Sequence, residues 1–162
     1  MKYQIDQSGK IEQTNIKTVV AICNGEDLAI VLNSSDKKLI QNIFRQTKHA
    51  KNFPFVVFAA LLALLIKKVN PKNKILVDEE YTGQEKLITE KYVNFMRCLK
   101  AKSIPQIEFG HVGKSAKVHR FGYLVWLGKN KKSFSVKLTS ILELIFEHKN
   151  DRNLNASRPR SV

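Results

Sequence analysis

The sequence predicts an α/β fold, in which a mixed five-stranded sheet carries helices on both faces. Two observations predict it. Three strand-like segments follow one another near the start of the chain, with turn signals between them, and such segments pair as antiparallel neighbours. Helical and strand-like segments then alternate along residues 34–148, which is typical of βαβ units with parallel strands.

The antiparallel part lies in the first third of the chain. Residues 2–6 (KYQID) form a short extended segment that a Ser-Gly turn follows. Residues 16–23 (IKTVVAIC) and 27–32 (DLAIVL) are apolar and rich in β-branched side chains. Asn24-Gly25 between them tolerates positive φ and favours a hairpin. We therefore expect three antiparallel strands in succession.

Two helices follow these strands. Residues 34–46 place apolar side chains along one face, and Ser34 or Ser35 can cap this helix. Residues 53–66 (FPFVVFAALLALLI) predict a buried helix, because they are apolar on all sides and fewer than the roughly 20 residues that span a bilayer. Lysines on both sides leave a helix at a membrane surface as the alternative, although such helices keep a polar face.

Strands and helices alternate in the rest of the chain. Residues 74–78 (KILVD) are almost wholly apolar, as in the middle of a parallel sheet. Thr82 and Glu85 have the spacing of a capping box at the start of the next helix. The later elements are a strand at 106–110, a helix around 118–125 that Gly122 weakens, and an amphipathic helix over 135–148.

Length and composition predict one globular domain. The chain has 162 residues, 43% hydrophobic and 26% charged, which suits a domain at residues 1–149 with a flexible basic tail at 150–162. The two cysteines lack metal-binding spacing and are expected to be free thiols in a reducing compartment. No secretion signal is recognisable. We therefore expect a cytoplasmic protein without a membrane partner.

The charge balance favours a polyanionic partner. Lysine and arginine number 28 against 14 acids, a formal net charge of +14, and neutralising phosphates releases counterions. The expected partner is DNA or RNA. A charge that serves only solubility, or an adaptor for an acidic protein, is the alternative. The expected nucleic-acid contacts are Lys114, Lys117, Arg120, Lys129 and Lys131, extended by Lys132, Arg158 and Arg160.

Acidic residues are scarce, so their positions are informative. Asp78, Glu79 and Glu80 follow one another at the carboxyl end of a predicted buried strand, where α/β sheets bind ligands. Asp6 ends the run Tyr-Gln-Ile of the first strand. If these strands are parallel neighbours, Asp6 and Asp78 can share a divalent ion. The alternative is an ordinary turn at Asp6 and a solvated junction at Asp78.

The segments YQIDQSGKIE and ILVDEEYTGQEKL, together with the strand order, resemble the ribonuclease H-like superfamily, in the style of small RuvC-type nucleases. The resemblance covers about residues 1–128. It implies that Asp6 and Asp78, with Glu79 as substitute, hold Mg²⁺ or Mn²⁺ for hydrolysis of phosphodiester bonds. His119 stands where many members carry a further acid and is a candidate metal ligand, since imidazole suits Mn²⁺ better than Mg²⁺. An ordinary histidine on the helix surface is the alternative.

The sequence departs from that family at two places. The helix over 34–46 lacks the glutamate of ribonuclease H enzymes, and residues 111–124 contain no acid. These departures keep a second hypothesis open, a catalytically inactive nucleic-acid-binding or assembly protein on the same fold. Phosphate-loop, serine-hydrolase and zinc-protease motifs are absent from the sequence.

Overall fold

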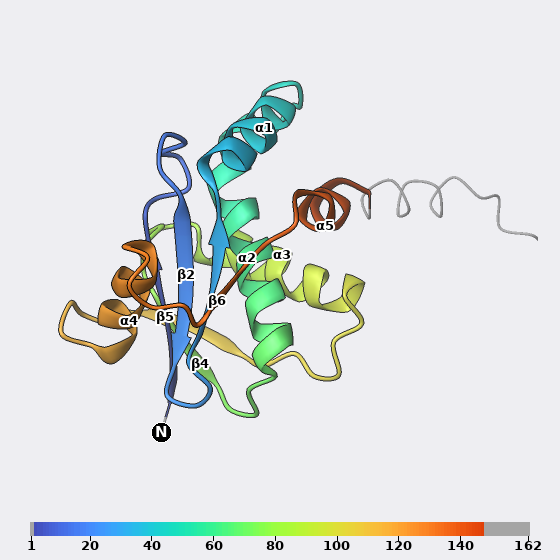
Figure 1. The fold of residues 1–162 in the computed structure, drawn as a ribbon. Coiled ribbons are helices and arrows are strands. Elements are labelled where there is room, and N and C mark those ends of the chain that lie inside the picture. Colours follow the sequence, from blue (N-terminus) through green and yellow to red (C-terminus); the bar gives the residue numbers. More distant parts are fainter. Residues whose placement is uncertain (1, 148–162) are drawn as a thin grey trace, which may run out of the picture.

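The computed structural model of the chain describes residues 2–147 and contains one mixed sheet of six strands. The predicted α/β class is confirmed, and helices lie on both faces of the sheet (Figure 1). The strand order is β5-β4-β1-β2-β3-β6. The basic tail expected at residues 150–162, with Arg158 and Arg160, lies outside the described residues.

The first three strands form the expected antiparallel unit. They are β1 (Tyr3–Ser8), β2 (Thr18–Cys23) and β3 (Leu28–Leu32), and each pairs with the next. In the β2–β3 connection Asn24 has a φ of 77°, as the hairpin signal predicts. Strand β1 runs two residues further than expected, so that Asp6 lies within it and not at its end.

The other strands are parallel to their neighbours. Strand β4 (Ile75–Asp78) pairs with β1, and β5 (Ile107–Gly110) pairs with β4. The expected number of five strands is wrong, because β6 (Ser133–Ser135) adds a sixth beside β3. This strand has only three residues, Ser-Phe-Ser, and lies in a lysine-rich segment without an apolar run. It therefore depends on pairing with an open sheet edge, which local sequence does not reveal.

One face of the sheet carries the larger hydrophobic core. Helices α2 (Phe53–Val69) and α3 (Glu85–Cys98) pack there, and α1 (Ser34–Arg45) adds Ile40 and Phe44. A single 3-10 turn, η1 (Ala50–Asn52), precedes α2. The helix expected at 135–148 begins later, as α5 (Leu138–Leu142), and continues as a π-helical turn η2 (Glu143–Glu147).

Two predicted helix caps differ from the structure. Asn33, and neither serine after it, caps α1, because its side-chain oxygen accepts the Asp36 N–H at 2.8 Å. Thr82 does not cap α3, which begins at Glu85 after Gln84. The turn at Gly83, with a φ of 87°, separates Thr82 from the helix.

Helix α2 is the interior helix predicted from the apolar run. Residues 50–69 are long and apolar enough to cross a bilayer, which on its own is weak evidence for a membrane span. In the structure 61% of the apolar window is buried. The fully buried side chains of this helix include Leu61, Leu62 and Leu65. The arrangement is that of a core helix in a water-soluble α/β domain.

Helix α4 (Lys117–Trp126) lies on the opposite face of the sheet from α2 and α3 (Figure 1). Its residues Val118, Phe121 and Val125 pack against side chains of β2 and β3. Gly122 weakens the helical pattern, but it permits close approach, because a Cβ there would lie 3.2 Å from the Ala21 Cβ. This contact brings α4 against the centre of the sheet.

The β1–β2 loop begins at Gly9, where the backbone requires glycine. Its φ is 77°, and a Cβ would collide with the Lys17 carbonyl oxygen. Gly83 has a φ of 87° but no atom within 4 Å of such a Cβ. We expect Gly9→Ala to lower the unfolding free energy by about 3 kcal/mol or more, and Gly83→Ala by only about 1–2 kcal/mol. Urea denaturation measures both, and equal losses would show that the Lys17 contact is unimportant.

Candidate functional site

Three acidic side chains meet at the centre of the sheet. The parallel pairing of β1 and β4 places Ile5 beside Val77, so the next residues, Asp6 and Asp78, are neighbours. One carboxylate oxygen from each of Asp6, Asp78 and Glu80 can be chosen so that all three lie within 4.8 Å of one another. The structure therefore brings together the two aspartates named from the sequence and adds Glu80.

Strand alternation explains which acids meet. Ile5 and Val77 belong to the core on the α2 side, so Asp6 and Asp78 face the α4 side. Two residues beyond Asp78, Glu80 joins the aspartates. The predicted substitute, Glu79, is not in this cluster but is exposed, and a hydrogen bond to Glu85 raises its pKa. The spacing of two residues from Asp78, which returns a side chain to the same face of a strand, is the sequence signal that favours Glu80 over Glu79.

The cluster is electrostatically costly. Asp6 is only 5% exposed, and burial raises its pKa; the hydrogen bond with His119 opposes this increase, and the Asp78 charge adds to it. Burial, followed by the charges of Asp6 and Asp78, raises the pKa of Glu80 to about 7. Carboxylates this close resist ionising together unless a cation lies between them.

Lysine and arginine do not neutralise this cluster by direct contact. In residues 2–147 the only ion pair to any of the three acids is that of Asp6 with His119. The charge of Lys10 lowers the pKa of Glu80, but this effect is smaller than the increase that burial and the two aspartates cause. Glu108 on β5 differs, because Lys2 and Lys74 bind its two oxygens at 2.8 and 2.6 Å.

His119 reaches the cluster from α4. Its Nδ1 lies 2.7 Å from Oδ2 of Asp6, and its side chain is 38% exposed. An ionised carboxylate only accepts hydrogen bonds, so Nδ1 carries the proton when Asp6 is charged. The sequence suggested His119 as a metal ligand, whereas the structure places it against Asp6 and outside the group of three acids. Its geometry is that of a residue that orients a ligand.

The β5–α4 loop fixes the second aspartate. The Val112 N–H donates to Oδ1 of Asp78 at 2.9 Å, which orients this carboxylate toward the cluster. His111 beside it is exposed. The Glu79 N–H donates to the Gly110 carbonyl at 3.1 Å, and the Glu80 N–H donates to the Asp78 carbonyl at 3.0 Å, which closes a tight turn directly after β4. Backbone contacts therefore hold Asp78 and Glu80 in place.

The donor set fits a hard divalent cation. Three carboxylates from adjacent segments offer oxygen ligands, which Mg²⁺ and Mn²⁺ both accept. The cluster lacks thiolates, and the buried thiol of Cys23 lies beside Asp27 instead, so soft-metal chemistry is not indicated. The raised pKa of Glu80 reflects the same excess of negative charge that a bound cation would offset.

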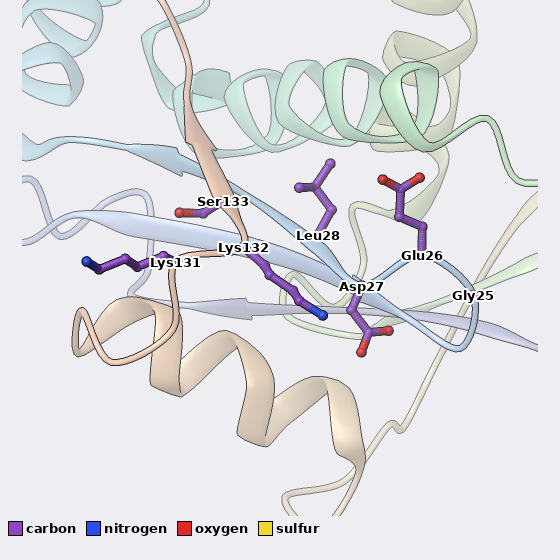
Figure 2. A pocket seen from close by; sticks show the side chains of 7 residues that line it. All are labelled: Gly25, Glu26, Asp27, Leu28, Lys131, Lys132 and Ser133. Atoms are coloured by element: carbon purple, nitrogen blue, oxygen red, sulfur yellow. The ribbon is translucent and has the colours of Figure 1, made fainter.

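The predicted nucleic-acid contacts lie in different surroundings. Lys114, Arg120 and Lys129 are exposed. Lys117 is also exposed but pairs with Asp27 at 2.9 Å, which offsets its charge. Lys131 lines a hollow of about 590 Å³ whose wall also includes Lys132, Glu26 and Asp27. Figure 2 shows these side chains, and the two acids make this hollow poorly suited to a polyanion.

Comparisons with known proteins provide no family assignment. No protein-family model, curated protein or solved structure matches this chain. The resemblance to the ribonuclease H-like superfamily therefore stays a prediction. The candidate site stands on the geometry of Asp6, Asp78, Glu80 and His119 alone.

The raised pKa of Glu80 predicts a pH-dependent stability of the metal-free protein. Between its usual 4.5 and about 7 the folded state holds a proton that the unfolded state has released. In EDTA the unfolding free energy should therefore fall as pH rises through this window, by about 1–3 kcal/mol. Urea titrations at several pH values test this, with Glu80→Gln as control. If the unfolding free energies of wild type and Glu80→Gln changed equally with pH, the pKa of Glu80 would not be raised in the folded protein.

Proposed function

We propose that this protein is a cytoplasmic, divalent-metal-dependent nuclease that hydrolyses phosphodiester bonds of DNA or RNA. The observation that carries the proposal is the cluster of Asp6, Asp78 and Glu80, which no lysine or arginine contacts in the described chain. The protein around it has a formal net charge of +14. An acidic centre for a cation within a basic protein suits a substrate made of phosphates.

The sheet supports a ribonuclease H-like arrangement. Strand β1 lies between β2 and β4, the first three strands are antiparallel, and β4 and β5 run parallel to β1. The sequence predicts three antiparallel strands followed by parallel strands, and the resemblance implies acids on the first and fourth strands. Asp6 and Asp78 occupy those strands. Strand β6 is an addition beside β3 and does not alter the position of the acids.

Each residue of the cluster has a definable task. Asp6, Asp78 and Glu80 would hold Mg²⁺ or Mn²⁺, and His119 would orient Asp6 through the bond at Nδ1. The bound metal would supply Lewis acidity and lower the pKa of a water molecule. In the hydrolysis, the water oxygen bonds to phosphorus, the bond from phosphorus to the leaving sugar oxygen breaks, and that oxygen gains a proton. The exposed Lys114 and Arg120 would neutralise phosphates nearby.

A catalytically inactive nucleic-acid-binding or assembly protein is the second candidate. A missing ligand favours this candidate. Ribonuclease H enzymes carry a further metal-binding glutamate on the helix that corresponds to α1, and α1 (SSDKKLIQNIFR) contains none, so the cluster has only three carboxylates. Both candidates require binding to nucleic acid. Only the nuclease requires turnover, so cleavage in the presence of metal separates them.

The first test of the proposal is cleavage by charge-removing variants. We expect wild type to cleave DNA or RNA in Mn²⁺ or Mg²⁺ but not in EDTA. Asp6→Asn, Asp78→Asn and Glu80→Gln should each reduce the rate by about 100-fold or more while nucleic-acid binding persists. His119→Ala should lose less, about tenfold. Gel assays of labelled strands, duplexes and hybrids measure these rates.

Glu79→Gln is the matched control, because it removes the same charge one residue from Asp78 and Glu80 but outside the cluster. It should cleave as wild type does. If pure wild type cleaved none of these substrates, the nuclease proposal would fail and the binding protein would replace it. If Asp6→Asn cleaved normally, the activity would belong to another site or to a contaminant.

The charge excess predicts salt-sensitive binding. Each neutralised phosphate releases counterions, so affinity for DNA or RNA should fall steeply and log-linearly with salt, with little preference for sequence. Fluorescence anisotropy in EDTA at about 50 to 500 mM salt, a range of about one decade, measures the slope. Absence of binding at low salt, combined with tight binding to an acidic protein, would favour the adaptor instead.

A further inference from the structure

The outward face of α4 carries a half-exposed aromatic ring. Tyr123 is 51% exposed, and Arg120 and Leu127 are exposed beside it along the same helix face. The opposite side of the helix supplies Val118 and Phe121 to the core. Within residues 2–147 neither the Tyr123 hydroxyl nor the Arg120 guanidinium forms a side-chain hydrogen bond or an ion pair.

The position of this ring relates it to the acidic cluster. Tyr123 follows His119 by four residues, so the two side chains are neighbours on one flank of α4, about 5–6 Å apart at Cβ. His119 itself contacts Asp6 at 2.7 Å. The exposed ring therefore lies about one helical turn from His119, the residue of α4 that contacts the cluster. A strand whose phosphate bound at the cluster would pass this flank of α4, where Tyr123 is exposed.

The charge of the surrounding chain indicates what covers the ring. Residues 109–142 contain no aspartate or glutamate, and this segment includes the whole of α4. Its seven basic residues are Lys114, Lys117, Arg120, Lys129, Lys131, Lys132 and Lys137. Lys117 pairs with Asp27, and Lys131 and Lys132 lie near Glu26 and Asp27. Arg120 and Lys129 are therefore the basic residues closest to the ring in sequence that have no such partner in the described chain. An exposed aromatic side chain beside such basic residues is the surface that single-stranded nucleic acids bind, by stacking of bases and neutralisation of phosphates.

We propose that Tyr123 is a stacking platform for an unpaired base, with Arg120 on the adjoining phosphate, so that the substrate class of this site is single-stranded nucleic acid. The inference rests on the proposed function only for the chemical class of its ligand. A base inside a duplex already stacks on both faces and cannot cover a ring on a helix surface. The stacking platform therefore selects strands or strand ends with unpaired bases.

Binding to strands of matched charge tests the platform. Fluorescence anisotropy in EDTA compares three labelled probes of about 20 nucleotides, which is one to two binding sites of a typical single-strand-binding domain. The probes are poly-dT, a duplex of the same length, and a strand of abasic sites that has the same number of phosphates. Wild type should bind poly-dT at least about fivefold more tightly than the abasic strand. Tyr123→Ala should weaken poly-dT binding by about 5- to 100-fold and leave abasic-strand binding unchanged. Tyr123→Phe should keep the affinity of wild type.

Leu39→Ala is the control for loss of an exposed apolar side chain, because Leu39 is 50% exposed on α1 and has no aromatic ring. It should bind poly-dT as wild type does. Equal affinity of wild type for poly-dT and the abasic strand, tighter binding of the duplex, or an equal effect of Leu39→Ala and Tyr123→Ala would overturn the stacking platform. Each of those outcomes leaves the nuclease proposal standing, whereas no binding to any strand would overturn both.

Discussion

The candidate site depends on the parallel pairing of β1 and β4. This pairing aligns Ile5 with Val77, and both side chains are fully buried against the α2 side. A shift by one residue would turn one of them out of the core, so burial of apolar area holds the register. The acids that follow, Asp6 and Asp78, are consequently forced together on the other face. Packing of the hydrophobic core thus brings the two carboxylates together, and burial with the charge of Asp78 raises the pKa of Asp6.

The close packing of α4 on the sheet is the second constraint. Gly122 sits opposite Ala21, which pairs with Asp6 in the β1–β2 ladder. Two small residues at this contact let the helix approach, and three positions earlier on α4 His119 reaches Asp6. A residue that looks unfavourable for a helix in the sequence is therefore a packing requirement of the site, since the cost of glycine in a helix is only about 1 kcal/mol.

The sequence predicts those features that local patterns determine. The antiparallel unit, the interior helix α2 and the nearness of Asp6 to Asp78 follow from apolar runs and strand order. Strand β6 was missed because it exists only through pairing with β3. Glu80 was overlooked in favour of Glu79, although side-chain alternation distinguishes them. The contact of His119 with Asp6 joins residues 113 positions apart, and no local signal contains that geometry.

The distribution of charge separates this cluster from an ordinary surface. A chain with 28 lysines and arginines can neutralise its acids, as two lysines do at Glu108, where ion pairing lowers the pKa to about 2. At Asp6 and Glu80 the shift is in the opposite direction, because burial and like charge prevail. Folding therefore tolerates an uncompensated acidic centre inside a basic protein. Such a centre gains most from a ligand that brings positive charge, while the basic surface around it gains most from a polyanion.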